Sequence, residues 1–203
     1  MNAQTASEVK IGDEDRLRAD VYNFLGLLLA RPADQILLDQ CSDLSGDESE
    51  FGQAMNGLAR VAKVSKVKGV ESEFNALFIG LGRGELLPYA SFYITGFLNE
   101  KPLAALRSDM AAMGIRRSET VYEPEDNIAS LMEMMGALIV GRFGEPRPVE
   151  AQREFFNKHI GPWAGHFFTD LEGAKNSVFY GSVGQVGRLF MEIECEAFRM
   201  SAR

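Results

Sequence analysis

Apolar residues recur every three or four positions through most of this sequence, and that spacing leaves few fold classes open. The clearest case is the stretch 126–143, which carries on one face Ile128, Leu131, Met132, Met135, Leu138 and Ile139. This spacing predicts a helix, because a helix brings residues three and four apart onto the same side. No segment alternates apolar and polar residues as a half-buried strand does, and no internal repeat is present. The sequence therefore predicts an all-α fold.

The same spacing, interrupted by glycine, proline and other turn residues, divides the chain into segments. We expect helices at 13–31, 33–42, 48–64, 67–79, 89–98, 102–113, 126–143, 148–160, 162–172 and 176–200. In the last of these, Gly181, Gly184 and Gly187 recur every third residue, which indicates close helix packing or a local bend. The prediction is a helical bundle of roughly nine or ten helices.

The domain organisation expected from this pattern is one compact unit made of two halves. Residues 1–12 are polar and aperiodic and are expected to form a flexible tail. The N-terminal helical half covers 13–114, a connecting loop covers 115–125, and the C-terminal helical half covers 126–203. The loop is compatible with either a compact monomer or an exchanged dimer.

Composition and charge exclude several classes of function. The 203 residues carry a net charge of −8, which repels the phosphate backbone of nucleic acids but attracts basic peptides. The first apolar run, 24–30, is too short to cross a bilayer, so we expect no stable membrane insertion. Only two cysteines occur, Cys41 and Cys195, which is typical of a reducing compartment. We therefore expect a cytoplasmic protein that does not bind nucleic acid.

Motifs for catalysis, metals and cofactors are missing from the sequence. His159 and His166 have no cysteine nearby, and no Glu-x-x-His pair exists. The glycine-rich stretch 80–84 follows a helical segment and lacks the Gly-Lys-Ser/Thr of a phosphate-binding loop. We therefore expect no catalytic residue, no metal and no cofactor. The alternative function is a helical metal-dependent enzyme acting on a phosphorylated or nucleotide substrate. A transcription regulator would need a basic helix, for which Arg116 and Arg117 are too little.

Acidic residues gather at the start of the 126–143 helix. Between Ser118 and Gly141 there are five acids and no lysine or arginine; they are Glu119, Glu123, Glu125, Asp126 and Glu133. In one interpretation, Asp126 caps the helix and the other acids complement the helix dipole. However, a cap needs one carboxylate, and four lie close together here. The alternative interpretation is a basic ligand, such as an arginine whose planar fork pairs with carboxylates.

A second candidate region comprises the segment 71–78, the glycine-rich break and the segment 87–93. Its aromatic residues suit a buried core. In the functional interpretation, Pro88, Tyr89 and Ser91 line a groove for an apolar peptide segment, with Tyr89 offering a flat face and a hydroxyl. Met134 is a candidate for the edge of such a groove.

These two regions resemble the TorD/DmsD family of redox-enzyme maturation chaperones, to which NarJ is related. Glu73-Phe-Asn-Ala-Leu-Phe78 leads into Pro88-Tyr-Ala-Ser-Phe-Tyr93, which is similar to the family's Pro-Tyr-x-Ser-x-Tyr segment. Glu123-Pro-Glu-Asp126 resembles the start of the family's Glu-Pro-x-Asp-His signature. The signature histidine is Asn127 here, which can form hydrogen bonds but cannot carry a proton's charge near neutral pH.

The resemblance implies a chaperone without catalytic turnover. Such proteins bind the twin-arginine leader and the apo form of a molybdopterin-dependent oxidoreductase, and they assist cofactor insertion before export. The implied partners are the catalytic subunit of a molybdenum-containing oxidoreductase and its twin-arginine signal peptide. The implied peptide-binding residues are Glu123, Pro124, Asp126, Asn127, Pro88, Tyr89 and Ser91. Among these, Asp126 and Glu123 would receive the arginines, while Pro124 would fix the loop. The identity of the client enzyme stays open.

Overall fold

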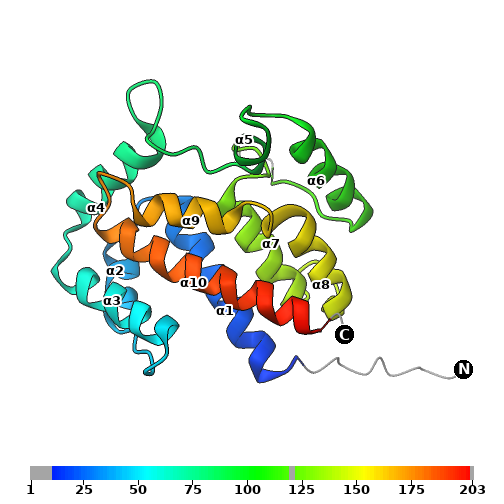
Figure 1. The fold of residues 1–203 in the computed structure, drawn as a ribbon, viewed down its shortest axis with the longest axis horizontal. Coiled ribbons are helices and arrows are strands. Elements are labelled where there is room, and N and C mark those ends of the chain that lie inside the picture. The colour runs from blue at the N-terminus through cyan, green and yellow to red at the C-terminus, as the bar shows by residue number, and fades with distance from the viewer. Residues whose placement is uncertain (1–10, 119–121, 202–203) are drawn as a thin grey trace, which may run out of the picture.

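The computed structural model describes residues 11–118 and 122–201, which form helices joined by turns and loops, without a strand (Figure 1). This confirms the predicted all-α class. The α-helices are α1 (Asp13–Ala30), α2 (Gln35–Ser42), α3 (Glu50–Val64), α4 (Val67–Phe74), α5 (Ala90–Thr95), α6 (Lys101–Ala112), α7 (Ile128–Val140), α8 (Val149–Phe155), α9 (Ala164–Glu172) and α10 (Phe179–Met200). Two π-helical turns, η1 (Asn75–Ile79) and η2 (Phe156–Ile160), extend α4 and α8.

The π-helical turns are the main local difference from the prediction, which has uniform helices over 67–79 and 148–160. At the end of η1, the backbone N–H of Gly80 donates to the Asn75 carbonyl at 2.7 Å, five residues back. The N–H of Gly161 donates to the Phe156 carbonyl at 2.8 Å in the same way. A π-helical turn adds one residue per hydrogen-bonded ring. Apolar spacing does not distinguish it from an α-helical turn over so short a length.

Helix α7 lies at the centre of the fold and packs most extensively against α1. The predicted apolar face is buried, but so are Ala129, Met134 and Ala137, so that the helix is enclosed on nearly every side. The expectation that Met134 lies at the edge of a groove is therefore wrong. The backbones of α1 and α7 approach closely, since a Cβ added at Gly26 would lie 3.3 Å from the Ala129 carbonyl oxygen.

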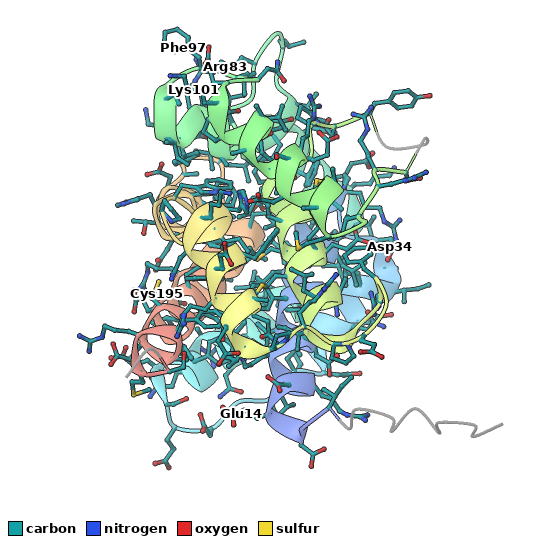
Figure 2. All side chains as sticks on the ribbon, turned by 90° about the vertical axis from the view of Figure 1, so that its right-hand side faces the viewer. Glu14, Asp34, Arg83, Phe97, Lys101 and Cys195 are labelled. Carbon is teal, nitrogen blue, oxygen red and sulfur yellow. The ribbon has the colours of Figure 1, made fainter. Side chains whose placement is uncertain are left out.

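Helix α10 packs against α9 and α3 (Figure 1). The predicted close packing of its glycines is confirmed at two of the three positions. A Cβ added at Gly184 would lie 2.5 Å from the backbone nitrogen of Glu172, and one added at Gly187 would lie 2.2 Å from the Phe168 ring. In the view of Figure 2, Cys195 of α10 and Asp34, which precedes α2, lie on opposite sides of the molecule.

The core combines residues from both sides of the loop at 115–125, because α1 packs on α7 and α3 packs on α10. The division into two halves at that loop stays a prediction. No helix among the described residues combines the length and apolarity needed to cross a membrane.

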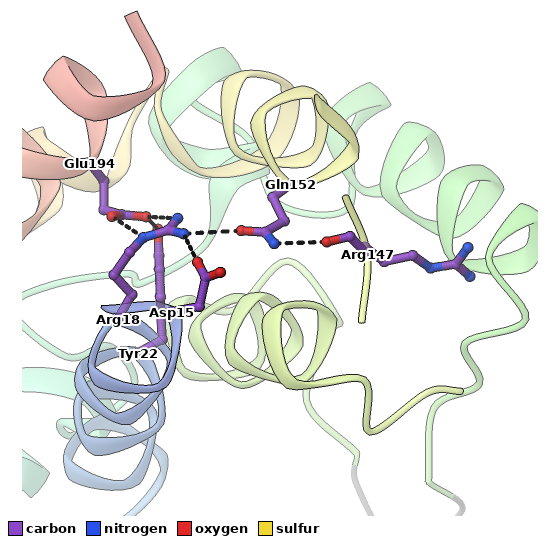
Figure 3. A network of polar contacts seen from close by, with 6 residues as sticks. All are labelled: Asp15, Arg18, Tyr22, Arg147, Gln152 and Glu194. Carbon is purple, nitrogen blue, oxygen red and sulfur yellow. Dashed lines mark hydrogen bonds and ion pairs between the residues drawn. The ribbon is translucent and has the colours of Figure 1, made fainter. Parts of the chain in front are cut away.

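A buried polar network ties α1 to α10 and α8 (Figure 3). The Arg18 guanidinium donates through Nε and Nη2 to the two carboxylate oxygens of Glu194, each at 2.8 Å. Tyr22 donates its hydroxyl to the same carboxylate at 2.8 Å. Arg18 also donates to Asp15 at 2.8 Å and to Gln152 at 3.2 Å. The Glu194 side chain is almost fully buried, so these donors satisfy a charge that water cannot reach.

Candidate functional site

A groove of about 610 Å³ lies along α1 and α7, and its described lining includes no residue of α8 or α10. Its apolar lining includes Leu27 of α1 and Phe78 and Ile79 of η1. Leu27 and Ile79 are more than half exposed, which is unusual for large apolar side chains in a concave surface. Arg31, another lining residue, forms an ion pair with Asp34 at 3.2 Å.

Two segments far apart in the sequence meet at one end of the groove; we call residues 88–91 and 122–127 the entrance segments. Tyr89 and Asn127 form an isolated antiparallel bridge. The N–H of Ala90 donates to the Asp126 carbonyl at 3.0 Å, and the N–H of Ile128 donates to the Pro88 carbonyl at 2.9 Å. The structure thus brings together the two regions that the sequence singled out separately.

Among the predicted site residues, Pro88, Tyr89, Glu123 and Asn127 line the groove. The other three, Pro124, Asp126 and Ser91, do not line it. Pro124 shapes its segment instead, since its carbonyl accepts the N–H of Asn127 at 3.1 Å and closes a turn. The Ser91 side chain, at the end of the first entrance segment, is fully buried.

Asp126 caps α5 and not α7, so the interpretation that Asp126 caps the 126–143 helix is wrong. Its Oδ2 accepts the backbone N–H of Ser91 at 2.8 Å, and the carboxylate is 1% exposed. The cap of α7 is Asn127, whose Oδ1 accepts the N–H of Ala129 at 2.9 Å. In the sequence Asp126 stands next to the 126–143 helix alone, and only the fold shows that a second helix, α5, starts beside it.

Glu123 is exposed in the groove, and its carboxylate accepts a hydrogen bond from the Tyr89 hydroxyl. Burial of the phenol, together with this hydrogen bond, raises the pKa of Tyr89 above its usual value. The hydrogen bond uses part of the acceptor capacity of the carboxylate, which has two oxygens and about four lone-pair sites. A donor on a ligand therefore still finds an acceptor at Glu123.

Glu125 is neutralised by the protein's own bases. Arg107 donates to it at 2.8 and 2.9 Å, and Arg117 lies 3.8 Å away. Burial alone would raise the pKa of Glu125, but the hydrogen bonds from Arg107 lower it below its usual value. Glu119 lies outside the described residues. The excess of negative charge at the entrance segments is therefore smaller than the count of acids in the sequence indicates.

Glu133 is a groove residue that the predicted site does not include. It is exposed, and no hydrogen bond or ion pair to its side chain occurs among the described residues. A signal was available in the sequence, because Glu133 is the only charged residue within α7. Within the same described ranges, no group of three or more His, Cys, Asp and Glu side chains is placed to hold a metal ion.

Comparison with known proteins assigns the chain to a family. The model of the nitrate reductase delta subunit family matches residues 45–169, more than half of the chain. The chaperone protein TorD of Vibrio atlanticus (strain LGP32) is 25% identical over 201 residues, which cover 88% of this chain and 93% of that protein. TorD of Aliivibrio fischeri (strain ATCC 700601 / ES114) is 27% identical, with 87% and 92% covered.

A solved structure agrees in fold. The crystal structure of a putative redox enzyme maturation protein from Archaeoglobus fulgidus superposes with a TM-score of 0.54 at 17% sequence identity, covering 93% of this chain and 99% of that one. The family match and the TorD relatives confirm the sequence resemblance to redox-enzyme maturation chaperones, and the solved structure agrees with them in fold. The chain belongs to the nitrate reductase delta subunit (NarJ/TorD) family and is a redox-enzyme maturation chaperone, not an enzyme.

Proposed function

We propose that this chaperone binds the twin-arginine leader of a molybdenum-containing oxidoreductase in the groove along α1 and α7. In this proposal it holds the apoenzyme in the cytoplasm until the cofactor is inserted, before export. The observation that carries the proposal is a groove that combines exposed apolar side chains with accessible carboxylates. A leader peptide has the matching chemistry, because arginines stand beside an apolar stretch.

The apolar part of the groove supplies a place for the apolar part of the leader. Leu27, Phe78 and Ile79 lie along it, and covering such side chains removes apolar surface from water. The ring of Tyr89 adds a flat face at the entrance segments. These contacts favour an extended apolar segment without selecting a particular sequence, so that the charged groups decide specificity.

In this proposal Glu123 is the direct contact for a leader arginine at the entrance segments. Asp126 and Asn127 position those segments, because the carboxylate of Asp126 holds Ser91 and the amide of Asn127 caps α7. Asn127 stands where relatives have the signature histidine. The described lining of the groove contains no histidine, the side chain whose usual pKa lies nearest to neutral pH.

Replacing Glu123 with glutamine tests the direct contact. We expect a peptide with two adjacent arginines followed by an apolar segment to bind with a dissociation constant in the micromolar range, and to bind more weakly as salt rises. Glu123→Gln should weaken binding by about tenfold, the typical effect of losing a charged hydrogen bond. Isothermal titration calorimetry measures both effects. Glu154→Gln, at an exposed position of α8, is the matched control for net charge. Absence of binding by the unmodified protein at low salt would refute the proposed function.

Replacing Asp126 with alanine separates positioning from direct contact. We expect the free energy of unfolding to fall by about 1 kcal/mol, because the N-terminus of α5 loses its cap. Peptide affinity should fall with it, since the entrance segments lose a connection. Urea denaturation of this variant measures its free energy of unfolding, and peptide titration measures its affinity. Lost affinity with unchanged stability would show that Asp126 itself contacts the peptide.

A further inference from the structure

Glu133 occupies a position in α7 that no structural role explains. It is the one exposed residue in this helix, which is otherwise buried or half-buried. It lies six residues beyond the N-cap Asn127, too far to complement the helix N-terminus, where dipole effects fade within the first turn. The residues three and four positions away are Ala129, Ser130, Gly136 and Ala137, so the helix offers it no basic neighbour.

The packing of α1 leaves the Glu133 side chain uncovered in the groove. The residue of α1 that faces it is Gly26, where an added Cβ would lie 3.4 Å from the Glu133 backbone nitrogen. About one turn further along α7, Gly136 faces the side chain of Asn23, whose oxygen would lie 2.7 Å from a Cβ added at Gly136. The α1 backbone thus lies directly on α7 without a side chain at position 26. Both Gly26 and Glu133 line the groove.

The carboxylates near the groove differ in their hydrogen-bond and ion-pair partners within the protein. Glu125 is paired with Arg107, and Glu123 accepts the hydroxyl of Tyr89. Glu133 has neither kind of partner among residues 11–118 and 122–201. An exposed carboxylate in an apolar groove is the group that gains most when a cation from a ligand arrives, because the ligand also removes water from around the pair.

We propose that Glu133 is a second cation-binding carboxylate of this groove, so that two guanidinium groups of one peptide are held separately, one by Glu123 and one by Glu133. This rests on the proposed function and deepens it. From the N-cap Asn127 to Glu133 the helix rises about 9 Å over six residue steps, and Glu123 stands before that N-cap in the chain. This rise is more than one guanidinium spans when it pairs bidentately. Two bases also line the groove: Arg31 is paired with Asp34, and Arg142, beyond Glu133 in the chain, disfavours a further cation there. Two carboxylates followed by a base match a ligand with two arginines better than a ligand with one.

A double-mutant cycle between protein and peptide tests this assignment. The proteins are the unmodified chain, Glu133→Gln, Glu123→Gln and the control Glu154→Gln. The peptides carry both arginines, the first only, the second only, or neither, with glutamine as the replacement. We expect Glu133→Gln to weaken binding of the two-arginine peptide by about tenfold at low salt. It should have no effect on one of the two single-arginine peptides, and Glu123→Gln should spare the other.

The possible results separate the inference from the proposed function. If the two-arginine peptide binds but Glu133→Gln behaves like Glu154→Gln, the inference is overturned and the proposed function stands. Equal weakening of all four peptides would also overturn it, because Glu133 would then act on the groove and not on an arginine. Failure of the unmodified chain to bind any of the peptides refutes the proposed function itself. Glutamine is nearly as good a helix former as glutamate, so the variant should fold normally.

Discussion

Replacing Arg18 with alanine is expected to lower the free energy of unfolding by about 3–5 kcal/mol, the cost of leaving one member of a buried ion pair uncompensated. Both terminal oxygens of Glu194 accept from Arg18 at 2.8 Å, and the Glu194 side chain is 1% exposed. Among the residues that the structure describes, the Tyr22 hydroxyl is then the one remaining donor to this carboxylate (Figure 3). Urea denaturation measures the loss.

Arg199→Ala is the matched control, because Arg199 pairs with Glu196 on the exposed surface of α10, the helix that carries Glu194. Its effect should stay within about 0.5 kcal/mol, as for other exposed ion pairs. A double variant with methionine at both Arg18 and Glu194 should lose less than Arg18→Ala. Equal losses for Arg18→Ala and Arg199→Ala would contradict the role assigned to this network.

Two glycines of α10, one helical turn apart, are expected to respond to alanine with opposite signs. At Gly184 an added Cβ would lie 2.5 Å from the Glu172 nitrogen and 2.9 Å from the Phe168 carbonyl oxygen. Both atoms belong to the backbone of α9 and cannot rotate away. Gly184→Ala should therefore destabilise the fold by about 1–3 kcal/mol, in spite of the better helix propensity of alanine.

At Gly181 the nearest atom to an added Cβ is 3.5 Å away, an ordinary contact distance. Gly181→Ala should stabilise the protein by about 0.5–1 kcal/mol, because alanine loses less conformational entropy in a helix. Thermal denaturation of both variants followed by circular dichroism provides the comparison. If both substitutions stabilised the protein, the close approach of α9 and α10 would not be present in solution.

The fold class and the approximate extent of every helix could be predicted because they depend on local physics. The period of a helix places residues three and four apart on one side, and the apolar pattern records this directly. The end of α6 was predictable, because the predicted helix 102–113 stops before Gly114, which has a positive φ of 75°. The end of α7 was predicted too late, at 143, whereas the helix ends at Val140, before Gly141 with its positive φ of 77°. The π-helical turns after α4 and α8 were not predictable, because one inserted residue hardly disturbs so short a pattern.

The candidate site was predictable only in part. The sequence singled out the residues around Tyr89 and those around Glu123, and the fold places them side by side. It indicated nothing of Arg107, which neutralises Glu125 from a helix eighteen residues earlier in the chain. It also assigned Asp126 to the wrong helix, because the start of α5 reaches that carboxylate only after folding.

Periodicity and motifs therefore predict that the chain is helical and single out the two regions that meet at the groove, since both signals lie in neighbouring residues. Which carboxylates stay accessible is a property of the tertiary structure. A charge is neutralised by whatever base or amide lies within hydrogen-bonding distance, and those partners come from other helices. Glu125 has such a base and Asp126 such an amide, whereas Glu133 faces a glycine and an open groove.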